Sequence, residues 1–240
     1  GYTPPAIKLS SDVMTPEVLW SFGRIGNVSV SPDGSKAVYD ITYFNKEEDR
    51  GYSDLYLMNL PEGQTTRLTD TDYNESDAGW TPDGKFITYL AKGQLWEMNP
   101  DGSNPRQVTD IPDGINGYVY APDMSKIVYL KDVQLEPTVQ DLYPDLPKAK
   151  ARIVDDQFYR HWNDWVDAYT HLFIADYVPA QPITTGKDIM EGERWESPVR
   201  PWGGVEQLAW TKDGKKLIYT CRKKIGIDYA ESTNTDLSAY

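Results

Sequence analysis

One short turn recurs four times along the chain and constrains its fold more than any other feature. The four copies are Ser31-Pro32-Asp33-Gly34, Thr81-Pro82-Asp83-Gly84, Ala121-Pro122-Asp123-Met124 and Thr211-Lys212-Asp213-Gly214. Proline pre-sets φ for the first central position of a type I turn, the aspartate bonds its own backbone, and glycine takes the left-handed position. Each copy therefore predicts a tight connection between two strands. Because Met124 replaces the glycine in the third copy, that turn is expected to be strained or of another type.

The stretches between these turns predict repeated units of four short strands. A run ending in tyrosine follows each turn, at residues 36–39, 85–89, 126–129 and 216–219. In the first two units a third run (54–59, 94–99), a polar turn and a fourth run (66–70, 106–110) come next. An all-β unit of 40 to 45 residues is the period of a four-stranded propeller blade. An ordinary antiparallel sandwich would not need the same turn in every unit.

We therefore predict an all-β chain of about four β-propeller blades, the last of them incomplete, with one long insertion. Residues 1–24 form an N-terminal cap segment, with a short helix that starts after Thr15. The partial propeller covers residues 25–240, with units at about 27–70, 72–110, 116–186 and 203–240. In the third unit, an insertion over 131–168 precedes a third strand near 171–176 and a fourth at 183–186. The unfinished last unit predicts that the chain is the front part of a longer protein, or that a partner covers its open side.

Composition excludes several classes of partner. With 37 acidic and 24 basic residues the net charge is −13, which argues against nucleic-acid binding and against electrostatic attachment to anionic lipid. No run of 18 apolar residues is present, so no membrane span is expected. The single Cys221 excludes an internal disulfide. The first residues show no signal pattern, so the protein is either cytosolic or has lost a signal peptide.

The repeats resemble those of two protein groups. The turn and the phrase at 101–107 are similar to the propeller repeats of the prolyl oligopeptidase family of serine peptidases, and to those of the TolB periplasmic proteins. The segment Tyr159-Arg160-His161-Trp162-Asn163-Asp164-Trp165 resembles a phrase in bacterial dipeptidyl-peptidase propellers of the acylaminoacyl-peptidase-like branch. This second resemblance favours the peptidase family, and it implies a bacterial protein secreted or held in the periplasm.

That resemblance implies where catalysis takes place. In the family, the propeller precedes an α/β-hydrolase domain that carries the Ser-Asp-His triad, and the propeller restricts access to peptide substrates. This chain has no Gly-x-Ser-x-Gly sequence around a nucleophile, and its only histidines are His161 and His171. We therefore expect no catalytic residue and no cofactor here, with a downstream hydrolase domain and peptides as partners. A TolB-like propeller that binds a protein without catalysis remains the alternative.

Two groups of residues are candidates for binding a substrate. Arg160 could hold a carboxylate or carbonyl with two hydrogen bonds, while His161, Trp162 and Trp165 form an aromatic wall. Alternatively, the tryptophans anchor the insertion on the blades and Arg160 pairs with a nearby aspartate. Glu47 and Glu48 could pair an ammonium group, as a glutamate pair does in relatives of dipeptidyl-peptidase IV. A solvated charged loop is the simpler interpretation.

No metal site is predicted. His161 and His171 lack the spacing of known ligand sets, and a structural histidine is the simpler interpretation. The turn aspartates are explained by their part in the turns.

Overall fold

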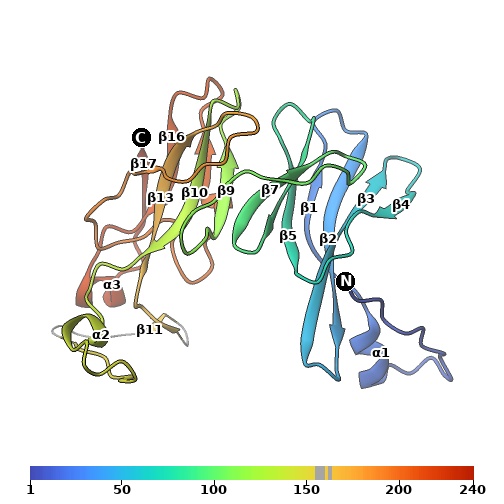
Figure 1. The fold of residues 1–240 in the computed structure, drawn as a ribbon, viewed down its shortest axis with the longest axis horizontal. Coiled ribbons are helices and arrows are strands. Elements are labelled where there is room, and N and C mark those ends of the chain that lie inside the picture. Colours follow the sequence, from blue (N-terminus) through green and yellow to red (C-terminus); the bar gives the residue numbers. More distant parts are fainter. Residues whose placement is uncertain (155–159, 162–163) are drawn as a thin grey trace. The chain divides into compact units, whose positions relative to one another are not determined.

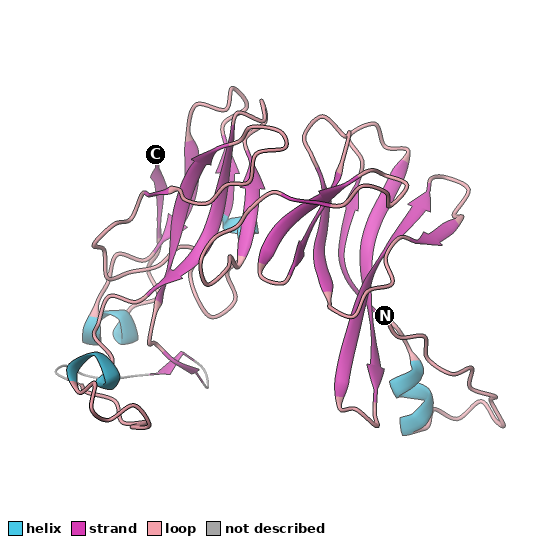
Figure 2. Ribbon diagram, in the orientation of Figure 1, coloured by secondary structure: helices cyan, strands magenta, loops and turns pink. Residues whose placement is uncertain are grey.

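The computed structural model describes residues 1–154, 160–161 and 164–240, and this part of the chain is mostly β (Figures 1 and 2). Its strands form four antiparallel sheets of three or four strands. The first two sheets are β1 (Arg24–Val30), β2 (Lys36–Asn45), β3 (Arg50–Asn59) and β4 (Thr65–Arg67), then β5 (Glu75–Trp80), β6 (Ile87–Ala91), β7 (Gln94–Met98) and β8 (Arg106–Gln107). The other two are β9 (Gly117–Tyr120), β10 (Lys126–Val133), β13 (Tyr169–Asp176) and β14 (Lys187–Asp188), then β15 (Leu208–Trp210), β16 (Leu217–Cys221) and β17 (Asp236–Ala239).

The remaining elements are short. Two residues each from β11 (Arg160–His161) and β12 (Asp164–Trp165) pair as a small hairpin. The helices are α1 (Pro16–Ser21), α2 (Val139–Leu142), α3 (Gly226–Glu231) and the 3₁₀ turn η1 (Val205–Gln207). In the described part of the chain, no helix is long and apolar enough to cross a membrane. The prediction of an all-β chain with four repeated sheets is confirmed, and the last sheet has three strands.

The repeated turn joins the first and second strands of every sheet. In each copy the amide of the fourth residue donates to the carbonyl of the first, at 2.8 or 2.9 Å. In the first copy, Asp33 Oδ1 accepts from the Ser31 hydroxyl (2.6 Å) and from the Ser35 amide (2.9 Å). Gly34 has a φ of +73°. The aspartate and the glycine therefore have the roles that the sequence predicts.

The third turn keeps this geometry without a glycine. Met124 has a φ of +58°, in the left-handed region that a side chain disfavours. Asp123 still accepts from the Ser125 amide at 2.9 Å, but Ala121 has no hydroxyl to donate to it. The expected strain at Met124 is confirmed.

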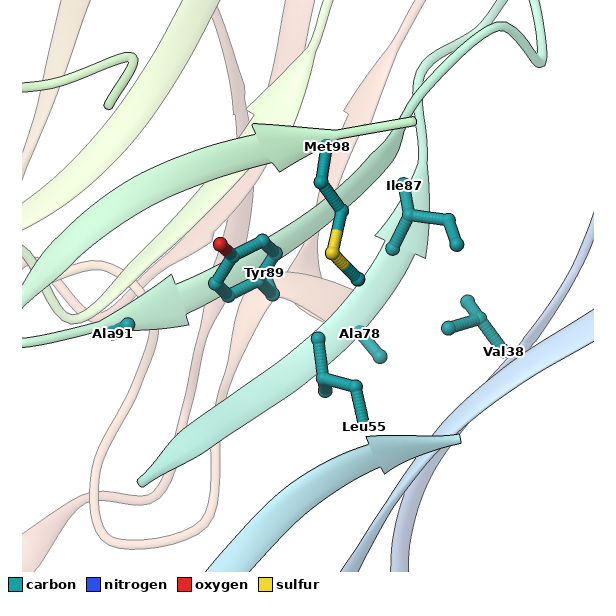
Figure 3. Packing of buried hydrophobic residues seen from close by; sticks show 7 residues of the cluster. All are labelled: Val38, Leu55, Ala78, Ile87, Tyr89, Ala91 and Met98. Carbon is teal, nitrogen blue, oxygen red and sulfur yellow. The ribbon is translucent and has the colours of Figure 1, made fainter. Parts of the chain in front are cut away.

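The described chain divides into two compact units. Unit 1 contains residues 1–114 and 178–184, and unit 2 contains residues 115–177 and 185–240. In unit 1 the two sheets bury a common apolar cluster (Figure 3), which consists of Val38, Leu55, Ala78, Ile87, Tyr89, Ala91 and Met98. In unit 2 the corresponding cluster consists of Val128, Leu130, Leu172, Met190, Leu208, Leu217 and Cys221. Each unit thus has its own core, made by sheets packed face to face.

The predicted fourth strand of the third unit is wrong. The strand β14 that pairs with β13 is Lys187–Asp188, opposite Phe173 and Ile174, and not residues 183–186. Ile183 belongs to unit 1 instead, where its amide donates to Val108 and its carbonyl accepts from Asp110, both at 2.8 Å. Ile183 is buried, and its backbone forms hydrogen bonds with the residues just after the short strand β8. A run of strand-forming residues does not by itself say which sheet it joins.

Candidate functional site

The connections between second and third strands are the most variable part of the sheets. Because the strands run antiparallel in chain order, these connections lie at the end of each sheet opposite the repeated turn. In the second sheet the connection is only Lys92-Gly93, whereas in the third it spans residues 134–168. Loops at one end of a rigid scaffold commonly carry binding functions. This end of each unit is therefore where a binding site is expected.

In unit 1 this end carries a long hairpin arm. Strands β2 and β3 pair over ten residues each, from Lys36 opposite Asn59 to Asn45 opposite Arg50. Strand β1 reaches only to Thr42, so residues 43–52 extend beyond their sheet (Figure 1).

Helix α1 packs on this arm. The Thr15 hydroxyl accepts a hydrogen bond from the Val18 amide at 3.4 Å, so the predicted helix cap is confirmed. The Trp20 ring meets Phe44 edge to face, with centroids 5.5 Å apart, and Arg24 lies over both rings. The chain passes close to the arm at Gly23, where a Cβ atom would lie 2.5 Å from the Ile41 side chain. A glycine is therefore required between α1 and β1.

Glu47 and Glu48 lie exposed at the tip of the arm. Their amides donate to the side-chain oxygen of Asn45, at 3.0 and 3.3 Å, which fixes the turn. The Glu48 carboxylate accepts from the Tyr52 hydroxyl and raises the pKa of that phenol. In the described structure Glu48 is thus engaged within the arm, and neither residue forms a sheltered carboxylate pair.

In unit 2, the described parts of the 134–168 connection are held by local interactions. The capping box of α2 forms between Thr138 and Asp141. Arg152 makes two hydrogen bonds to Asp167, Nε to Oδ1 at 2.9 Å and Nη2 to Oδ2 at 2.6 Å, and its guanidinium lies 5.2 Å from the centroid of the Trp165 ring. The hydrogen bonds from Arg152 lower the pKa of Asp167. Through its contact with Arg152, Trp165 helps to hold residues 152 and 167 of the connection together.

The other predicted binding residues of this segment are only partly described. The backbones of Arg160 and His161 pair with Trp165 and Asp164, respectively. Trp162 lies outside the described residues. The role of this group as a substrate wall therefore remains a prediction.

A polar network that the sequence did not suggest joins the base of this connection. Asp132 is the last residue but one of β10 and pairs with Thr170, the second residue of β13, and the Thr170 hydroxyl donates to Asp132 at 2.6 Å. Arg200 lies 3.4 Å from Asp132 and 3.1 Å from Glu196. The buried Glu196 also accepts from the Tyr229 hydroxyl of α3 at 2.8 Å. Only tertiary structure brings these four segments together, so no sequence spacing signals the network.

Burial sets the electrostatics of this network. Desolvation raises the pKa of Glu196, opposed by the charge of Arg200 and the hydrogen bond from Tyr229. Arg200 therefore stabilises the ionised form of Glu196, which burial disfavours. It also links Glu196 to Asp132 and Thr170, near the strand ends that the 134–168 connection joins.

His171 is fully buried and has both ring nitrogens engaged. Nδ1 lies 2.8 Å from Asp188 and Nε2 lies 2.9 Å from the carbonyl of Glu193. A carbonyl can only accept, so Nε2 carries a proton and donates it. His171 thus has a structural role and is not placed to act as a general base.

No metal centre was found in the part of the chain that the structure describes, where no group of three or more His, Cys, Asp or Glu side chains could hold an ion.

Four antiparallel sheets of three or four strands, each with the same turn between its first and second strands, place the chain among the propeller-type repeat proteins. Comparison with known proteins agrees with this class. The chain has 15% sequence identity and a TM-score of 0.56 to an acylaminoacyl peptidase of Pyrococcus horikoshii, over 83% of this chain and 28% of that one. At this identity the likeness concerns the fold alone.

Sequence similarity is more specific. The chain is 39% identical to dipeptidyl-peptidase 5 of Porphyromonas endodontalis over 96% of its length, and 39% identical to dipeptidyl-peptidase 5 of Porphyromonas gingivalis over 99%. It spans about a third of these relatives, 34% and 35% of their lengths. No family model matches the chain. Over most of its length, the chain is homologous to the propeller-like region of dipeptidyl-peptidase 5, in the prolyl oligopeptidase family.

Proposed function

We propose that these 240 residues are the substrate-gating propeller of a secreted bacterial serine exopeptidase that releases dipeptides from peptides. The observation that carries the proposal is the 39% identity to two bacterial dipeptidyl-peptidases 5 across nearly the whole chain. The chain itself has no Gly-x-Ser-x-Gly sequence, so its contribution is to binding and access.

In this proposal, catalysis belongs to an α/β-hydrolase domain in the remainder of the polypeptide. The relatives are about three times as long as the matched region, which leaves room for such a domain. The connections opposite the repeated turns would face the peptide or the catalytic domain. The arm of unit 1 and the insertion of unit 2 would then select substrates by shape and charge.

The test uses the protein as its native cells express it. Extracts are treated with a fluorophosphonate label, which reacts with active serine hydrolases, and blotted with an antibody against residues 1–240. We expect a labelled band well above 27.3 kDa, the mass of this chain, and dipeptide release by the immunoprecipitate. An unlabelled band at 27.3 kDa would contradict the proposal and favour a propeller that only binds a partner.

A further inference from the structure

The Arg24 side chain contacts aromatic rings and forms no ion pair with a described carboxylate. Its guanidinium carbon lies 5.1 Å from the centroid of the Trp20 ring and 4.6 Å from that of Phe44. Among the described residues, no carboxylate lies within ion-pair distance of Arg24, although the chain has 37 acidic residues to 24 basic ones. Other arginines of the chain do have acidic partners: Arg67 with Asp54, Arg106 with Glu97, Arg152 with Asp167, Arg194 with Glu136, and Arg200 with Glu196.

The surroundings fix the position of this side chain. Gly23 lets α1 turn directly into β1, which sets Trp20 and Arg24 against the arm. Opposite Phe44, the residue is Gly51, whose missing Cβ would lie 3.2 Å from the Phe44 ring. The two rings therefore have defined places, and Arg24 loses less freedom on binding than a free surface arginine would.

Contact with aromatic rings does not use up the hydrogen-bond donors of a guanidinium. The group carries five N–H donors in one plane, in a fork that matches a carboxylate. Arg24 is exposed, and Trp20 and Phe22 beside it remain 42% and 50% exposed. An anion bound at Arg24 would thus have an apolar aromatic surface next to it.

We propose that Arg24, with Trp20 and Phe44, forms a binding site for the carboxylate of a free peptide, with an apolar residue beside that carboxylate. The proposal rests on the proposed function in one respect, because peptides are the ligands that a peptidase propeller meets. With a net charge of −13, the chain as a whole repels anions, so binding here depends on the local donors.

The experiment measures binding without hydrolysis, in the intact natural polypeptide that contains residues 1–240. The probes are N-acetyl-D-phenylalanine and its amide, which differ only in the carboxylate, and the D-residue prevents turnover. By titration calorimetry at low salt, we expect the acid to bind at least about tenfold more tightly than the amide. Arg24→Gln should abolish this preference, and Arg24→Lys should weaken it, because lysine lacks the planar fork.

Arg50 supplies the matched control. It lies over the Tyr52 ring of the same arm, but its Nη2 donates to the Asp72 carbonyl at 3.1 Å. Arg50→Gln should keep the preference for the acid. Equal binding of acid and amide by the unmodified protein would overturn the proposal. Equal losses in Arg24→Gln and Arg50→Gln would overturn it as well. A missing fluorophosphonate label would count against the peptidase function without affecting this readout.

Discussion

Single residues decide how well each repeated turn fits its backbone. Gly34 and Met124 occupy the same place in their turns, with φ angles of +73° and +58°. Only glycine adopts this region without a steric penalty from Cβ, so the third turn is a local source of instability in unit 2. The hydrogen bond from the Ser125 amide to Asp123 and the pairing of β9 with β10 keep Met124 in this conformation.

We predict that Met124→Gly stabilises the protein by about 0.5–1 kcal/mol, because relief of the left-handed strain exceeds the entropy cost of a glycine in the unfolded chain. Urea unfolding measures the difference. The reciprocal control is Gly34→Ala, whose Cβ would meet nothing within 4 Å, so that its expected loss of about 1 kcal/mol is conformational. A neutral or destabilising Met124→Gly would show that the turn is not strained.

At the scale of an element, buried carboxylates make strand ends sensitive to pH. Glu75 begins β5 and is 1% exposed, and it accepts from the hydroxyls of Thr71 (2.6 Å) and Thr69 (3.3 Å). Desolvation raises its pKa above the ordinary 4.5, against the opposing hydrogen bonds. The turn residue Asp33 is the reverse case, because hydrogen bonds from Ser31 and Ser35 lower its pKa to about 2.

These two carboxyls predict opposite dependences on pH. A raised pKa means that the folded protein binds the proton more tightly, so the contribution of Glu75 is greatest below 4.5 and is lost as pH rises through its folded pKa. We expect Glu75→Gln to gain stability relative to the unmodified protein as pH rises above 4.5. Denaturant unfolding as a function of pH measures this difference.

Asp33→Asn should behave in the opposite way. The stabilisation by Asp33 is present above the ordinary pKa of 3.8 and is lost as pH falls toward 2. The variant should therefore be less stable than the unmodified protein at neutral pH, with the difference disappearing in acid. If the stability differences between each variant and the unmodified protein changed in the same direction with pH, the assigned causes would be wrong.

For the whole molecule, the path of the chain links the folding of the two units. After β13 the chain leaves unit 2 at Tyr177, contributes residues 178–184 to unit 1, and returns at Thr185. Ile183 is 6% exposed and its backbone extends the edge of the second sheet beyond β8. Residues 1–114 therefore lack a part of unit 1 that comes from later in the sequence.

We predict that Ile183→Ala destabilises unit 1 by roughly 2–4 kcal/mol, through lost burial and a cavity. Hydrogen exchange should show faster exchange of the Asp110 amide, which donates to Ile183. Val178→Ala, at a 45% exposed position of the same segment, should have little effect. Unchanged protection at Asp110 in Ile183→Ala would show that the segment does not support unit 1.

The sequence by itself determined the repeated sheets, the turn chemistry and the short helix after Thr15, because these depend on contacts between residues close in the chain. It did not place Ile183 in unit 1, or join Asp132 and Thr170 to Glu196, Arg200 and Tyr229. Nor did it reveal that Arg24 lies against the rings of both Trp20 and Phe44. Such contacts depend on which strand edge is left open and which side chains meet across segments, and only the tertiary structure decides these.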